Sequence, residues 1–281
     1  MMGIVRYLSR HGEYSHRLIG LLPSADPGAV EMAKSAGLDV LVGPPKEAVL
    51  KEMADADLVH LQFWNSPAVY QLLQSELPPM RLLIWFHVAG DKTPQIITRH
   101  LVNFADFALG SSPYHTDLPV FVDRAKDRSE FTGMIYDSTD FARVKGVTRK
   151  PHSNFIVGYI GTVDFVKMHP RYVPMSAAIK IPEVQFIICG GGIQEQLRQQ
   201  ATQLGVQHRF NFLGYVEDIS AVLSVLDVFG YPLCEDNYST AELVLQEAMH
   251  AGIPPVIFPY GGASRTVVHK DRKSTRLNSS H

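Results

Sequence analysis

Short apolar runs alternate along this chain with segments of helical period. The runs are rich in β-branched and aromatic residues, which favour strands, and apolar positions spaced three or four residues apart follow each run. This alternation predicts parallel sheets with crossover helices, which is the α/β class. The predicted strands are residues 17–22, 39–42, 58–63, 82–87, 107–110 and 133–136 in the first half, and 155–161, 184–189, 210–213, 228–231 and 255–258 in the second.

A basic, aperiodic stretch separates the two halves. The sequence RVKGVTRKPHSN, residues 143–154, holds four lysines and arginines, a glycine and a proline without any apolar period. Such a composition is typical of interdomain linkers. The length of 281 residues also suits two domains, at about 150 residues per domain. We predict a first domain over residues 1–145 and a second over residues 154–270.

Both ends of the chain depart from the alternation of strands and helices. The start, MMGIVRYLSRHG, follows a helical period and ends at a glycine, with no strand before it. Because the first strand of a doubly wound sheet lies at its centre, we expect the first domain to lack that strand. The end, DRKSTRLNSSH at residues 271–281, is polar and resembles a translated adapter. We expect a non-native tail there, with a natural disordered tail as the alternative. We also expect the chain to be truncated, and therefore to fold poorly or to be inactive.

Composition and charge limit the kinds of partner that we expect for this chain. The net charge of -2 gives no basic field for nucleic acid or for anionic lipid. No apolar stretch has the length of about 20 residues that a membrane helix needs, and no signal-peptide pattern opens the chain. The two cysteines, Cys189 and Cys234, lie in apolar runs, so we expect a reducing compartment, the cytoplasm.

The segment 228–268 carries the strongest chemical signal. Ser239 and Thr240 follow a polar loop and stand at the head of a predicted helix, residues 241–250. A helix N-terminus offers unpaired N–H groups and about half a positive charge, which suits a diphosphate. Glu247 lies about two turns further, on a face that it can share with Thr240. We expect Thr240 to hold the phosphate of a nucleotide and Glu247 to hold its ribose, with Ser239 and Ala241 as further donor-binding residues.

The sequence ELVLQEAMHAGIPPVIFPYGG resembles the nucleotide-binding signature of glycosyltransferase family 4. VGYIGTVDFVKMHP, VQFIICGGG and RFNFLGYVEDISAVLSVLDVFGYP resemble the preceding segments of that family's second domain, in the same order, so that the resemblance covers residues 154–269. It implies the GT-B fold, two Rossmann-like domains that face a cleft. It also implies transfer of a sugar from a nucleotide diphosphate donor, with retention of configuration at the anomeric carbon.

The family resemblance also assigns acidic residues. It places the residue equivalent to Glu247 on the donor ribose and an acidic residue upstream on the transferred sugar. Ser239 stands at the usual upstream position, eight residues before Glu247. We therefore take Glu242 as the preferred catalytic candidate, because YSTAE resembles a variant loop of bacterial members, and Glu235 as the alternative.

A second departure concerns the cations that face the diphosphate. Family members carry an arginine after the first glycine of the second domain, whereas Thr162 follows Gly161 here. Lys167 is the expected cation for the departing diphosphate, with Arg171 in reserve. Gly190, in CGGG, either cradles phosphate or forms a tight turn. Backbone groups at Tyr215 and Val216 are expected to contact the base.

The first domain contributes fewer candidates. RLLIWFHVAG resembles a family strand that ends in a histidine facing the donor sugar, so His87 is either a catalytic-site residue or a structural one. Trp64 and its neighbours at the end of the preceding strand either line the acceptor side or belong to the core. Asp55 and Asp57 have metal-ligand spacing, but their position predicts a solvated turn.

The family resemblance implies a hexosyltransferase, which we expect to be metal-independent and to need no cofactor beyond its nucleotide-sugar co-substrate. The acceptor is left open among a glycan, a lipid and a small molecule. A sugar-nucleotide epimerase of the same fold and a non-catalytic nucleotide-sugar-binding fragment are the alternatives, because a fold does not fix a function.

Overall fold

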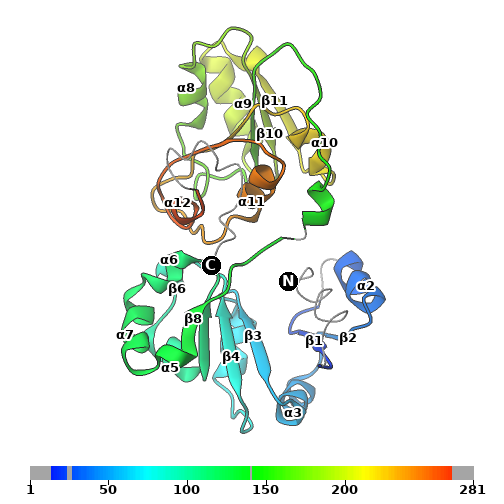
Figure 1. Cartoon of the computed structure of the whole chain (residues 1–281), viewed down its shortest axis with the longest axis vertical. Helices are drawn as coiled ribbons and strands as arrows, with labels where there is room; N and C mark the ends of the chain where they lie inside the picture. The colour runs from blue at the N-terminus through cyan, green and yellow to red at the C-terminus, as the bar shows by residue number, and fades with distance from the viewer. Residues whose placement is uncertain (1–13, 24–26, 140, 268–281) are drawn as a thin grey trace. The chain divides into compact units, whose positions relative to one another are not determined.

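The computed structural model describes residues 14–23, 27–139 and 141–267. The chain divides into two compact units, Met1–Asp140 and Phe141–His281 (Figure 1). The division falls just before the basic stretch at residues 143–154. The helix expected at residues 1–12 and the tail expected at residues 271–281 lie outside the described residues.

The second unit is built on one parallel sheet of five strands. Its order is β11-β10-β9-β12-β13, so the chain adds two strands on one side of β9 and then two on the other. This reversal beside β9 is the topological switch point of a doubly wound fold, where such sheets bind their ligands. The strands are β9 (Ile156–Ile160), β10 (Gln185–Cys189), β11 (Phe210–Gly214), β12 (Val228–Tyr231) and β13 (Pro255–Ile257).

Helices connect these strands and enclose a single apolar core. The core centres on the rings of Tyr159, Phe186, Phe229 and Tyr231, which are fully buried. The helices are η2 (Phe141–Val144), α8 (Tyr172–Ala177), α9 (Gln194–Gln203), η3 (Gln207–Arg209), α10 (Ile219–Leu223), α11 (Leu243–His250) and α12 (Ala263–Thr266).

The first unit has two parallel sheets and a short hairpin. One sheet pairs β1 (Arg17–Gly20) with β2 (Asp39–Val42). The other has the order β3-β4-β7-β8, from β3 (Val59–Phe63), β4 (Leu82–Phe86), β7 (Phe107–Gly110) and β8 (Thr132–Met134). The hairpin joins β5 (Asp91–Lys92) to β6 (Gln95–Ile96). No strand of the described residues joins β1 to β3.

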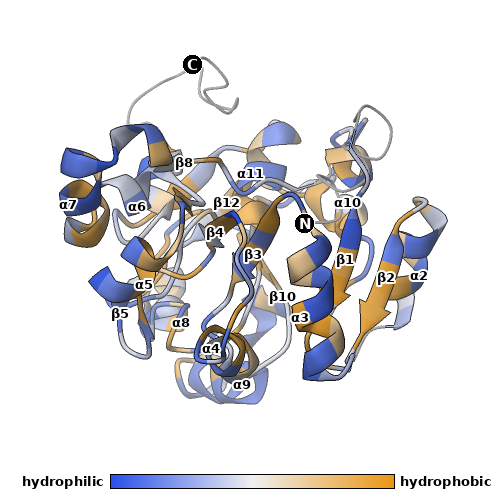
Figure 2. Cartoon of the chain, turned by 90° about the horizontal axis from the view of Figure 1, so that it is seen from below, coloured by the Kyte–Doolittle hydropathy of each residue, from blue (hydrophilic) through white to orange (hydrophobic). Residues whose placement is uncertain are grey.

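The helices of the first unit bury their apolar faces against these strands. Figure 2 shows helices such as α3 and α7 with one hydrophobic and one hydrophilic side. Val49, Met53 and Leu72 form a small cluster that packs against Ile19 of β1. The helices are α2 (Pro27–Ser35), α3 (Lys46–Asp55), α4 (Pro67–Leu73), α5 (Arg99–Phe104), α6 (Pro113–Thr116), α7 (Pro119–Asp127) and η1 (Ser129–Phe131).

The predicted α/β class with parallel sheets is confirmed. Each of the eleven predicted strands is present, and its ends lie within two residues of the predicted ends. The hairpin of β5 and β6 was not predicted, because strands of two residues carry no period. No helix of the described segments is both long and apolar enough to cross a membrane.

Candidate functional site

Two loops meet at the carboxyl edge of the second unit's sheet. The loop after β9 and the loop after β12 share an antiparallel bridge between Met168 and Leu233. The N–H of His169 donates to the carbonyl of Pro232 at 2.9 Å, and the N–H of Cys234 donates to the carbonyl of Lys167 at 2.8 Å. Because β9 and β12 flank the switch point, these contacts fix the loops where a ligand of a doubly wound sheet is expected.

Lys167 and Glu242, predicted from different segments, form an ion pair at this place. The Lys167 Nζ lies 3.1 Å from the Glu242 Oε2, and both side chains are largely buried. The Tyr231 hydroxyl also donates to the Glu242 carboxylate. Burial, followed by the charge of Glu242, raises the pKa of Tyr231 well above its ordinary value. The hydroxyl therefore stays protonated and remains a donor to Glu242.

The start of the following helix differs from the prediction. The helix α11 begins at Leu243, whereas a start at Ala241 was predicted. Glu242 has φ 42° and ψ 72°, a left-handed conformation that interrupts a right-handed helix. Ser239, Thr240 and Ala241 therefore precede the helix in a buried loop, and the predicted start at Ala241 is wrong by two residues.

The buried loop before α11 is braced by the glycine turn that follows β13. The N–H of Gly262 donates to the carbonyl of Ser239 at 3.0 Å, and a Cβ at Gly262 would lie 1.5 Å from the carbonyl oxygen of Thr240. The Asn237 Oδ1 accepts from the N–H of Ser239 at 2.8 Å. The Ser239 hydroxyl is buried and has no hydrogen-bond partner within the described part of the chain. It is therefore a candidate donor to a ligand.

The glycine-rich turn after β10 packs directly on the loop after β9. A Cβ at Gly190, whose φ is 136°, would lie 1.8 Å from the carbonyl oxygen of Gly161. The N–H of Val163 donates to the carbonyl of Gly191 at 3.0 Å. Thr162 is fixed through its carbonyl, which accepts from the Tyr159 hydroxyl at 2.8 Å. Close backbone packing thus accounts for Gly190, and its contact with phosphate stays a prediction.

Glu247 lies on α11 and is paired with an arginine that the sequence did not single out as a site residue. The Arg143 Nε and Nη2 donate to the Glu247 Oε1 and Oε2, each at 2.7 Å. The Glu247 side chain is 1% exposed and that of Arg143 is 54% exposed. Arg143 belongs to η2, whose Phe141 stacks on His250 of α11 at 4.6 Å. The segment predicted as a linker therefore begins inside the second unit.

The remaining candidates of the second unit occupy more open positions. Tyr215 is exposed, and Val216 packs against the edge of the core. Glu235, the alternative to Glu242, accepts from the Tyr260 hydroxyl at 3.2 Å on the surface. The reserve cation Arg171 precedes α8, and its N–H donates to the His169 Nδ1 at 3.1 Å. The roles of Glu242 and Lys167, and those of Glu235 and Arg171 as their alternatives, stay predictions.

His87 of the first unit is held by protein groups on both ring nitrogens. Its Nδ1 lies 3.1 Å from the Asp137 Oδ2, and its Nε2 lies 2.6 Å from the Gln62 Oε1. The residue is 6% exposed, and the Trp64 ring stacks on it at 4.6 Å. Asp137 and Gln62 were not predicted, because no spacing rule links them to His87. In this arrangement no ring nitrogen of His87 is left for a sugar hydroxyl.

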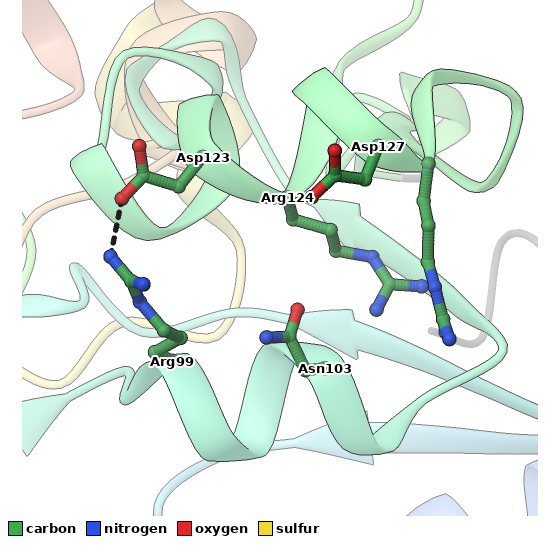
Figure 3. Close-up of a pocket in the computed structure, with 6 residues that line it drawn as sticks. Arg99, Asn103, Asp123, Arg124 and Asp127 are labelled. Atoms are coloured by element: carbon green, nitrogen blue, oxygen red, sulfur yellow. Dashed lines mark hydrogen bonds and ion pairs between the residues drawn. The ribbon is translucent and has the colours of Figure 1, made fainter.

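A surface pocket between α5 and α7 in the first unit contains none of the predicted site residues. Arg99 reaches across it to Asp123 at 2.6 Å (Figure 3). The guanidinium of Arg124 donates to the carbonyls of Val102, Ala105 and Asp106, which lie in and after α5. These bonds satisfy the backbone beyond the end of α5, so Arg124 is a structural residue.

The described residues contain no group of three or more histidine, cysteine, aspartate or glutamate side chains arranged to hold a metal ion. Asp55, one of the pair with metal-ligand spacing, forms an exposed ion pair with Lys51.

The strand order defines the second unit as a Rossmann-like domain, with a cation–carboxylate pair at its switch point. Residues 140–276 match the family model described as Glycosyl transferases group 1. This part of the chain is therefore similar to a glycosyl transferase group 1 domain. A search of curated proteins finds no match to the sequence.

Solved glycosyltransferases resemble the chain as a whole. HepE (Alr3699) of Anabaena, in complex with UDP, is 20% identical, with a TM-score of 0.69 over 95% of this chain and 79% of that one. A glycosyltransferase of Rickettsia africae is 12% identical, with a TM-score of 0.72 over 94% and 76%. The lipopolysaccharide outer core galactosyltransferase WaaB is 12% identical, with a TM-score of 0.66 over 95% and 78%. At these identities the likeness shows the fold, and the predicted GT-B class is confirmed.

Proposed function

We propose that this protein is a retaining glycosyltransferase of family 4, which moves a hexose from a nucleotide diphosphate sugar to an acceptor. The buried pair of Lys167 and Glu242 carries the proposal, because it sets a cation and a carboxylate together at the switch point of a glycosyl transferase group 1 domain. The domain of residues 154–270 takes the donor, and the domain of residues 1–145 takes the acceptor.

Lys167 and the loop before α11 receive the diphosphate. The Lys167 ammonium has three donors and uses one toward Glu242, which leaves two for phosphate oxygens. The Ser239 hydroxyl and backbone groups of Thr240 and Ala241 contribute further donors. Fixed donors aimed at charge that grows on a leaving group lower the barrier to its departure. Glu242 accepts a hydroxyl of the transferred sugar and so orients the anomeric carbon.

In the transfer step the acceptor hydroxyl attacks the anomeric carbon from the face that the diphosphate leaves. The bond between that carbon and the phosphate oxygen breaks, and the bond to the acceptor oxygen forms. The proton of the acceptor moves to the leaving phosphate oxygen, so no protein base is needed. Lys167 stabilises the charge of the leaving group in place of a metal, and activity is expected to persist in the presence of EDTA.

Glu247 binds the ribose of the donor. Both oxygens of its carboxylate accept hydrogen bonds from Arg143. Because Glu247 is nearly inaccessible, the half-exposed guanidinium of Arg143 must shift when the nucleotide enters. Uridine diphosphate sugars are the first donors to test, since the solved structure of HepE contains UDP-glucose.

The experiment is incubation with UDP-, GDP- and ADP-sugars, with and without a panel of glycan, lipid and small-molecule acceptors. We expect nucleotide release that depends on an acceptor and a product with the anomeric configuration of the donor, read by NMR. Glu247→Ala is expected to weaken donor binding, and Lys167→Ala to reduce turnover. Isomerised sugar nucleotide without an acceptor would identify an epimerase, and binding without turnover would identify a non-catalytic protein.

A further inference from the structure

Trp64 presents its ring to solvent at the carboxyl end of β3. The residue is 57% exposed, and its ring stacks on that of His87 with a centroid distance of 4.6 Å and an interplanar angle of 5°. His87 is buried, so it covers one face of the indole. Exposed tryptophans that lie singly on a surface are ordinary. A parallel stack on a buried histidine whose two ring nitrogens both have hydrogen-bond partners is a more specific arrangement.

The support beneath Trp64 is a cluster of rings. His87 contacts both Trp64 and the buried Trp85, whose ring centroid is 4.6 Å from that of His87 at an interplanar angle of 49°. Trp85 stacks in turn on His60 at 5.8 Å. The bonds of His87 to Asp137 and Gln62 fix the orientation of the histidine ring. Trp64 therefore rests on a base whose rotation is restrained.

The chain that carries Trp64 is restrained as well. Asn65 has φ 55°, a left-handed conformation that a residue other than glycine seldom adopts. Its side chain donates to the carbonyl of Pro94 at 3.0 Å and accepts from the Tyr70 hydroxyl at 2.9 Å. These bonds hold the turn and keep Trp64 directed outward without a ligand. Such preorganisation reduces the conformational entropy that binding would otherwise cost.

We propose that Trp64 is a stacking platform for a pyranose ring of the acceptor, which makes the acceptor a carbohydrate. The face of an aromatic ring is electron-rich, and one face of a pyranose carries several C–H groups, so the two surfaces are complementary. The assignment to the acceptor rests on the proposed function, in which the second unit provides the donor contacts. His87 is a positioning residue that acts through Trp64.

Binding is tested first, separately from turnover. The chain has two tryptophans, so Trp85→Phe leaves Trp64 as the only indole emitter. Methyl glucopyranoside, methyl galactopyranoside and maltotriose are titrated, with fluorescence and saturation-transfer NMR as readouts. At least one probe should shift the Trp64 emission. Trp64→Leu should weaken that binding about two- to tenfold, and Trp64→Phe should weaken it less. Phe104→Leu, at an exposed aromatic of the same unit, is the matched control.

The two proposals fail in different ways. In an active enzyme, Trp64→Leu should raise the acceptor KM while the UDP dissociation constant and the melting temperature stay unchanged. Without transferase activity, glycoside binding still tests the platform. The platform is rejected if the unsubstituted protein binds none of the probes, if Trp64→Leu binds them equally well, or if that variant loses UDP affinity. His87→Ala should lower the fluorescence anisotropy of Trp64 in the Trp85→Phe background, as its positioning role requires.

Discussion

At the scale of single residues, the buried pair of Lys167 and Glu242 joins stability to the proposed chemistry. A buried charge that loses its partner keeps its desolvation cost, and the loss amounts to about 3–5 kcal/mol. Lys167→Met should therefore lower the free energy of unfolding toward that range. The hydrogen bond from Tyr231 to Glu242 remains in this variant, so we expect a loss of stability at the lower end of that range. Urea unfolding measures the difference.

A double-mutant cycle separates the pair from the individual residues. Lys167→Met combined with Glu242→Gln removes both charges and should recover part of the stability lost in Lys167→Met, whereas turnover should stay low. Lys180→Met, at an exposed lysine of the same unit, serves as a control and should change neither quantity. Additive losses in the double variant would show that the two charges do not interact.

His115 gives the first unit a dependence of stability on pH. It lies in α6 and is fully buried, its Nε2 donates to the carbonyl of Val88 at 2.7 Å, and burial lowers its pKa below the ordinary 6.5. The unfolded chain therefore binds this proton more readily than the folded one. His115 therefore makes its full contribution to the free energy of unfolding above about pH 6.5, and this contribution is lost as the pH falls below that value.

The check on His115 is a comparison of unfolding at neutral and acidic pH. His115→Gln keeps an N–H donor for the carbonyl of Val88 but cannot gain a proton. Its free energy of unfolding should vary less than that of the original protein between about pH 7 and pH 5, the range in which an unfolded histidine titrates. Equal slopes for the two proteins would exclude His115 as the source.

At the scale of elements, the glycine turn after β10 provides a matched pair of substitutions. A methyl group at Gly190 would meet the backbone of Gly161 and also force a left-handed alanine. At Gly191 the same methyl group meets nothing within 4 Å. Gly190→Ala should lose at least about 1–3 kcal/mol of stability, whereas Gly191→Ala should be close to neutral. Thermal unfolding of both variants measures this, and similar losses would contradict the packing described.

The contact between η2 and α11 connects the start of the second unit to the proposed ribose site. Arg143→Met removes the cation from a buried carboxylate, and the cost should be about 1–3 kcal/mol because the guanidinium is half exposed. If the ribose displaces Arg143 from Glu247, the same variant should bind UDP at least as tightly as the original protein. Isothermal titration calorimetry distinguishes this from weaker binding, which would contradict the displacement.

The sequence predicts an element well when the interactions that fix this element are between residues close together in the chain. The strands were predictable because their apolar runs are local. The start of α11 was not, since Glu242 is held left-handed while Lys167 and Tyr231 bind its carboxylate, and Lys167 is distant in sequence. The pair of Arg143 and Glu247, 104 residues apart, has no local signal either. The family resemblance supplied Lys167, Glu242 and Glu247 as candidates, but not the partners that hold them.

At the scale of the whole molecule, the chain distributes its candidate groups between two units with separate apolar cores. Lys167, Glu242 and Glu247 belong to the second unit, whereas Trp64 and His87 belong to the first. Both tryptophans lie in the first unit, so indole fluorescence reports the unfolding of that unit alone. Hydrogen exchange at β9 and β12 reports the second unit.

This division predicts a selective effect of the donor nucleotide. A ligand that binds only the folded state stabilises it by about 2.7 kcal/mol at a concentration of 100 times its dissociation constant. If UDP binds through Lys167, the loop before α11 and Glu247 alone, it should slow exchange in β9 and β12 and leave the midpoint of the tryptophan transition unchanged. Lys167→Met should abolish most of the protection. If the two probes reported equal stabilisation of the two units, the first unit would also gain free energy from the nucleotide. The assignment of the donor to the second unit would then be wrong.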